Sequence, residues 1–100
     1  MSVTLASPYI DSTSWLRGNL HAHTTVSDGA CSPEEVIADY ERRGYDFLAI
    51  SDHDRFVPPA NYQGRTKMTL IGGVETSARG PHILHVDARE VVEPVRDRQV

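Results

Sequence analysis

Apolar positions along the chain form four short runs, and a helical pattern separates the first two. Residues 15–24 alternate partly between apolar and polar side chains and predict a first strand. The apolar run at 46–51 predicts a second strand, buried on both faces, and 68–74 and 82–86 predict a third and a fourth. Strand, helix and strand in this order predict a right-handed βαβ unit, and therefore an α/β fold with a parallel sheet.

The predicted helix has well-marked ends. We expect Ser32 to be its N-cap, with Pro33 at the first helical position and Glu35 completing a capping box. Gly44 stands where a glycine commonly ends a helix. The helical spacing predicts one apolar face, which consists of Val36, Ile37 and Tyr40.

Turn-forming residues and charge separate these elements and suggest the domain limits. Ser27-Asp28-Gly29 predicts a turn, and residues 54–66 predict a loop with two prolines, an asparagine and a glycine. Residues 1–14 are polar and predict an N-terminal arm. Residues 15–100 then form one domain.

Composition limits the size and class of this domain. The chain has 100 residues and a net charge of −4, too short for a complete eight-stranded βα-barrel of about 250 residues. The sequence contains no basic tract, so we expect no broad nucleic-acid-binding surface. The single cysteine, Cys31, excludes an intramolecular disulfide. No apolar run is long enough for a membrane span and no signal peptide is visible, so we expect a cytoplasmic protein with no membrane partner.

Side chains typical of metal ligands gather where the predicted strands end. His21 and His23 stand two apart at the end of the first strand, so both lie on one face and can share a metal. Carboxyl ends of parallel strands meet at one edge of a sheet, so we expect these groups to converge. Imidazole with carboxylate suits zinc, manganese or iron, and not a cysteine-based zinc finger. We call the candidate ligands the rim cluster: His21, His23, Asp28, His53, Glu75 and His82.

Each of these groups also has an ordinary structural interpretation. The two-apart histidines can be a surface pair, the segment around Asp28 simply a turn, and Glu75 a solvated strand end. Asp52 is interpreted as a cap or salt-bridge partner rather than a ligand. Only one of His82 and His85 should face the site, because strand positions three apart point to opposite faces; we favour His82, which can otherwise be a satisfied buried histidine.

Four segments resemble motifs of the PHP (polymerase and histidinol phosphatase) superfamily of metal-dependent hydrolases. The first spans 18–29 with its two histidines, the second spans 44–54, and the third spans 71–75 and continues at 82–84. The amino-acid sequences of the first two motifs are most similar to those of the carbaryl-hydrolase-like metallohydrolases. The resemblance implies a distorted seven-stranded βα-barrel, similar to a TIM barrel, of which this chain holds the first three to four βα units.

The resemblance also implies two or three metal ions at the mouth of the barrel. His21, His23 and Glu75 would bind one metal, and Glu75 would bridge to a second metal that His82 also binds. The two remaining members of the rim cluster, Asp28 and His53, would hold the third.

The implied activity is hydrolysis of a small-molecule phosphate ester by metal-activated water. Amide or carbamate hydrolysis is the alternative substrate class, and a non-catalytic metal-binding fragment is the alternative to an enzyme. Arg55 follows the second motif and is a candidate phosphate ligand, although a solvated loop residue is the simpler interpretation.

The chain departs from the family pattern in its later part. Family members supply a later His or Cys ligand and an Asp-x-His motif, whereas all five histidines here precede residue 86. We therefore expect the N-terminal part of a PHP domain, with an incomplete metal site. An open sheet edge would then invite self-association.

Overall fold

The computed structural model describes residues 14–78 and 80–91. Nearly all of the predicted arm, and the last residues of the predicted domain, lie outside this part, so the domain limits stay predictions. Within it no helix has the length and apolar character that a membrane span requires. The elements are β1 (Gly18–Ala22), α1 (Pro33–Arg42), β2 (Phe47–Ile50), the 3-10 helices η1 (Pro59–Asn61) and η2 (Gln63–Arg65), β3 (Thr69–Thr76) and β4 (Ile83–Val86).

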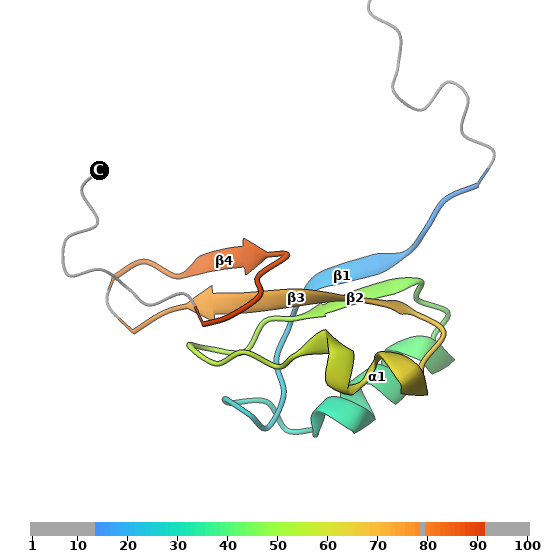
Figure 1. Cartoon of the computed structure of the whole chain (residues 1–100), viewed down its shortest axis with the longest axis horizontal. Coiled ribbons are helices and arrows are strands. Elements are labelled where there is room, and N and C mark those ends of the chain that lie inside the picture. The colour runs from blue at the N-terminus through green and yellow to red at the C-terminus, as the bar shows by residue number, and fades with distance from the viewer. Residues whose placement is uncertain (1–13, 79, 92–100) are drawn as a thin grey trace, which may run out of the picture.

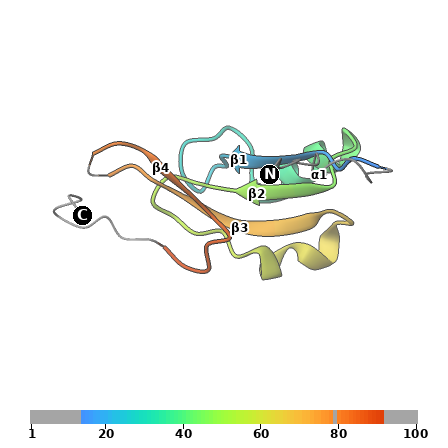
Figure 2. The same cartoon turned by 90° about the horizontal axis from the view of Figure 1, so that it is seen from above.

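The four strands form one sheet in the order β1-β2-β3-β4 (Figure 1). β1 pairs with β2 and β2 with β3 in parallel, as predicted, with Leu48 opposite Leu70. β4, however, pairs antiparallel with β3, so the prediction of an all-parallel sheet is wrong. Only residues 77–82 join these two strands, whereas a parallel crossover needs about a dozen residues or more. The resulting mixed sheet is curled (Figure 2) and is compatible with part of a barrel.

Helix α1 begins and ends as the sequence predicts. The Ser32 hydroxyl accepts a hydrogen bond from the Glu35 backbone N–H at 3.2 Å, and the Glu35 carboxylate accepts one from the Ser32 N–H at 3.1 Å. This backbone hydrogen bond from Ser32, more than the Ser32 side chain, lowers the pKa of Glu35. Gly44 follows the helix with φ +84°, a conformation that glycine adopts without steric penalty.

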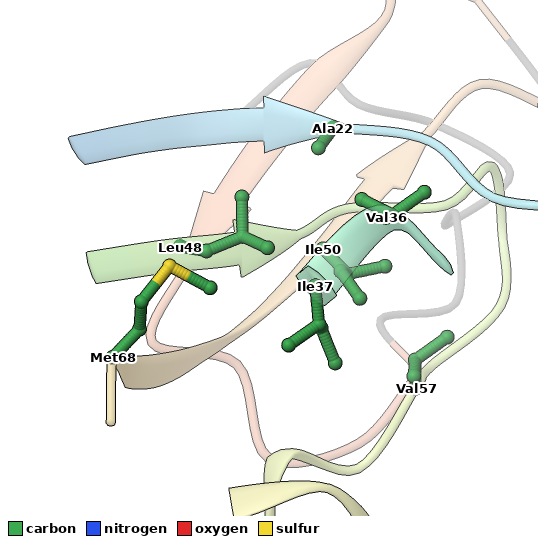
Figure 3. Close-up of a cluster of buried hydrophobic side chains, with 7 residues drawn as sticks. All are labelled: Ala22, Val36, Ile37, Leu48, Ile50, Val57 and Met68. Atoms are coloured by element: carbon green, nitrogen blue, oxygen red, sulfur yellow. The ribbon is translucent and has the colours of Figure 1, made fainter. Parts of the chain in front are cut away.

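The hydrophobic core lies between α1 and one face of the sheet (Figure 3). Leu48 at its centre has no exposed surface, and burying such a side chain contributes about 1.5–3 kcal/mol. Asn19 on β1 donates to the Tyr40 hydroxyl of α1 at 2.7 Å, which ties the edge strand to the helix. The buried cluster comprises Ala22, Val36, Ile37, Leu48, Ile50, Val57 and Met68.

A glycine in β3 lets the chain after β4 return close to the sheet. The Ala88 N–H donates to the Gly72 carbonyl at 3.0 Å. A Cβ atom on Gly72 would lie 1.9 Å from the Ala88 carbonyl oxygen. Any larger residue at this position would therefore push the returning chain away.

Candidate metal centre

The carboxyl ends of β1, β2 and β3 bring imidazoles and carboxylates to one edge of the sheet. His21 lies in β1 and His23 just beyond it, while His53 follows β2. His53 and Glu75 form an isolated parallel bridge, which extends the register of β2 and β3 to the edge. His82 immediately precedes β4 and approaches from the other side of Glu75.

The sequence predicts that Glu75 follows the third strand directly. In the structure Glu75 lies inside β3 instead. The strand is longer because β4 pairs with its final residues, placing Glu75 opposite Leu84 and Thr76 opposite Ile83. Glu75 is consequently 4% exposed. A buried carboxylate of this kind requires charged or hydrogen-bonding partners.

Those partners are four imidazole rings. The shortest contact joins Glu75 Oε2 to His21 Nε2 at 2.8 Å. The other carboxylate oxygen, Oε1, lies 3.3 Å from His53 Nδ1, 3.6 Å from His23 Nε2 and 3.7 Å from His82 Nδ1. One buried carboxylate thus lies at the centre of four histidines from three segments of the chain.

Asp28 lies on the solvent side of the same cluster. Its Oδ1 is 3.2 Å from His23 Nδ1, and its Oδ2 is 3.3 Å from His53 Nε2. The side chain of Asp28 is 65% exposed, against 6% for Glu75. The cluster therefore has one buried and one open carboxylate.

The donor atoms of the rim cluster fit divalent cations. Within the part of the chain that is described, the Nε2 atom of His23 is a buried side-chain nitrogen with no hydrogen-bond partner. Buried polar atoms are normally paired, and a metal ligand is one explanation for an exception. Three groups have ligand atoms within 4.8 Å of one another: His21, His23 and Glu75; His23, Asp28 and His53; and His53, Glu75 and His82.

All six predicted ligands are therefore close together, although their roles as ligands stay predictions. His85 lies opposite Val74 in the β3–β4 ladder and belongs to none of the three groups. Arg55 is exposed. The grouping differs from the implied assignment in one respect, because His23 and His53 each belong to two groups.

Asp52 has a structural role, as the sequence favours, but as a hydrogen-bond acceptor between loops rather than as a cap or salt-bridge partner. It is fully buried and accepts hydrogen bonds from the backbone N–H and the hydroxyl of Thr24, both at 2.7 Å. It also accepts one from the Ser27 hydroxyl at 2.5 Å. Asp52 thereby fixes the loop that carries Asp28 to the segment that carries His53.

Two polar residues near the cluster were missed by the sequence analysis. The Ser77 hydroxyl donates to Asp54 Oδ2 at 2.9 Å and lies 3.0 Å from His53 Nδ1. The Ser77 N–H donates to Asp54 Oδ1 at 3.0 Å, and this backbone hydrogen bond is the main cause of the lowered pKa of Asp54. Asp54 has φ +53°. Aspartate tolerates a positive φ better than most residues. An aspartate directly after His53 was therefore the sequence signal for a tight turn at this position.

Comparison with known proteins finds relatives that act on phosphate esters. The chain is 35% identical over 81 residues to a phosphoribosyl 1,2-cyclic phosphate 1,2-diphosphodiesterase of Eggerthella lenta, covering 72% of this chain and 31% of the relative. It is 36% identical over 72 residues to a 3′,5′-nucleoside bisphosphate phosphatase of Chromobacterium violaceum, covering 68% and 25%. It is 41% identical over 46 residues to the DNA polymerase/3′-5′ exonuclease PolX of Bacillus subtilis, covering 46% and 8%.

The matched part thus spans less than a third of each of these relatives. No family model matches the chain. No solved structure matches it significantly.

Proposed function

Because this chain belongs to the PHP superfamily, we propose that it forms the metal-binding part of a phosphoesterase. The observation that carries the proposal is the buried Glu75 carboxylate with four imidazoles within 3.7 Å of its oxygens. Such convergence of imidazole and carboxylate is typical of zinc, manganese and iron sites. The buried His23 Nε2, which has no hydrogen-bond partner among the described residues, supports the same conclusion.

The buried and the exposed residues of the rim cluster would have different roles. Glu75 lies deep and is held by the β3 backbone, so it would fix the imidazoles around it. Asp28 lies at the solvent side, where a substrate would approach. When bound, divalent cations supply positive charge that lowers the pKa of water and polarises a phosphoryl oxygen. Exposed Arg55 would bind the phosphate through its guanidinium.

Metal binding is tested first, on protein dialysed against chelator. Calorimetric titration with Mn²⁺ and Zn²⁺ should show binding by the wild type, loss of binding in His23→Ala, and unchanged binding in His85→Ala. His85→Ala is the matched control, because it removes an imidazole from outside the three ligand groups. Equal binding by the wild type and His23→Ala would contradict the proposal.

Activity is tested next with chromogenic substrates and Mn²⁺. Hydrolysis of 4-nitrophenyl phosphate or bis(4-nitrophenyl) phosphate that is abolished in His23→Ala would show that the ligands of this chain suffice for phosphoesterase activity. Arg55→Ala should raise KM for the phosphate substrate with little change in kcat. Turnover of a 4-nitrophenyl carbamate alone would assign the amide or carbamate class instead. Metal binding without turnover of either class would assign this chain a metal-binding role only.

A further inference from the structure

His53 belongs to two possible ligand groups, one with Asp28 and one with Glu75. Its Nε2 lies 3.3 Å from Asp28 Oδ2, and its Nδ1 lies 3.3 Å from Glu75 Oε1. A neutral imidazole carries one proton and offers one lone pair to a cation. The ring can therefore serve a site shared with Asp28 or a site shared with Glu75, according to which nitrogen carries the proton.

The Ser77 hydroxyl makes the shortest of these contacts to His53 and favours a proton on Nδ1, the nitrogen that also faces Glu75. Its oxygen is 2.9 Å from Asp54 Oδ2 and 3.0 Å from His53 Nδ1. A hydroxyl has one proton to donate, and a carboxylate can only accept. The Ser77 proton is consequently donated to Asp54, and the Ser77 oxygen accepts a hydrogen bond from Nδ1–H of His53.

Asp54 is a well-fixed acceptor for this purpose. Its N–H donates to the Glu75 carbonyl at 2.9 Å, and its Oδ1 accepts from the Ser77 N–H at 3.0 Å. Both carboxylate oxygens of Asp54 thus accept hydrogen bonds from Ser77.

We propose that Asp54 and Ser77 are positioning residues that hold His53 as its Nδ1–H tautomer and so reserve Nε2 for a cation shared with Asp28. While Nδ1 keeps its proton, His53 cannot bind a cation together with Glu75 and His82. Partners of this kind commonly orient histidine ligands in metal sites. The inference depends on the proposed metal-binding function for its purpose, but its geometric core concerns the metal-free chain.

The tautomer is tested in metal-free protein by NMR of ¹⁵N-labelled histidine rings in slightly alkaline buffer. The His53 signals are assigned by their loss in His53→Gln. We expect the wild type to show a protonated Nδ1 and an unprotonated Nε2. Ser77→Thr keeps the hydroxyl and should preserve this pattern, whereas Ser77→Ala should move the ring towards the Nε2–H form.

Asp54→Asn is a second variant and makes the opposite arrangement possible. Asparagine suits the positive φ, but its amide nitrogen donates, so it cannot accept both hydrogen bonds from Ser77. The Ser77 hydroxyl is then free to donate to Nδ1, and we expect the Nε2–H tautomer. A wild type in the Nε2–H form, or no response to Ser77→Ala and Asp54→Asn, would overturn the inference.

The consequence for metal binding is measured by calorimetry with Mn²⁺. Ser77→Ala should weaken one class of site by about 10- to 100-fold, the usual effect of removing a partner of a ligand, and Ser77→Thr should restore it. Failure of the wild type to bind any cation would contradict the proposed function and leave the tautomer result standing. Binding by the wild type with equal affinity in Ser77→Ala would contradict the inference alone.

Discussion

Carboxylates lie at both ends of the parallel strands, but they have different partners at each end. At the amino end, Asp46 accepts from the Arg17 backbone N–H at 2.8 Å. Glu41 accepts from the Lys67 N–H at 2.6 Å and the Thr66 hydroxyl at 2.8 Å, and these hydrogen bonds lower its pKa. Each carboxylate there has backbone partners and serves to join elements.

At the carboxyl end, the carboxylates of Glu75 and Asp28 face imidazole rings, while Asp52 and Asp54 keep backbone partners. Glu75 meets imidazoles, and His23 keeps a buried nitrogen without a hydrogen-bond partner among the described residues. An open groove lies at the amino end, beside Glu41 and Asp46, yet no ligand group of the described chain includes these residues. The comparison teaches that the partners of polar groups, more than the depth of a groove, distinguish a candidate site.

The largest expected difference between the two ends is in metal affinity. Glu75→Gln should lower the affinity for Mn²⁺ by more than about 100-fold, above the effect typical of an outer partner, because it removes the carboxylate shared by the imidazoles. Glu41→Gln is the matched change at the amino end and should leave the affinity unchanged. Calorimetric titration measures both. Equal losses would mean that the two ends do not differ as described.

The next largest effect concerns stability. Asp52→Ala should lower the free energy of unfolding by about 3 kcal/mol, because the buried donors of Thr24 and the half-buried hydroxyl of Ser27 lose their acceptor. Asp46→Ala, at the exposed amino end, should cost about 1 kcal/mol or less. Urea denaturation followed by circular dichroism gives both values. A larger loss from Asp46→Ala would reverse the order.

A smaller effect is expected after helix α1. Gly44→Ala should lower the free energy of unfolding by about 1 kcal/mol, since alanine must adopt the left-handed φ of +84°. Gly64→Ala is the control: its Cβ would also meet open space, but no left-handed φ is required there. Neither variant should change metal affinity. Unchanged stability in Gly44→Ala would mean that the helix ends in another conformation.

The smallest effect is a pH dependence at the capping box. The lowered pKa of Glu35 means that its ionised form stabilises the folded chain above the unfolded value, near 4.5, and that this stabilisation disappears as pH falls through the folded pKa. Wild type should therefore be slightly more stable than Glu35→Gln at pH 7, and the difference should vanish in acid. Urea midpoints at several pH values measure it. A difference that grows in acid would contradict this assignment.

Local features of the fold were predictable, while the long-range pairing was predictable only for the parallel strands β1, β2 and β3. The ends of α1 followed from Ser32, Pro33 and Glu35, because a capping box lies within one helical turn. The direction of β4 did not follow, because alternation along a strand is the same in either direction. The close approach of Ala88 to Gly72 depends on pairing between distant segments, which no local pattern reveals.

The candidate site divides in the same way. Residue type had already identified the six residues of the rim cluster. The parallel pairing of β1, β2 and β3 brings most of them to one edge, whereas His82 reaches that edge through the antiparallel β3–β4 hairpin. The positioning contacts of Ser77 did not follow, because they depend on the positive φ of Asp54 and on the lateral spacing of β2 and β3. Residue type thus predicted the candidate ligands, while the contacts that orient them required coordinates.

The separation of the ligands along the chain has a consequence for folding kinetics. The β3–β4 hairpin is local and can form within about 1–10 μs, whereas the contact between His21 and Glu75 joins residues 54 apart in sequence. Parallel pairing across such distances is slow. The complete ligand set therefore exists only once β1, β2 and β3 are paired. A divalent cation that binds this set would act after the folding barrier, slowing the unfolding of the chain far more than it accelerates folding.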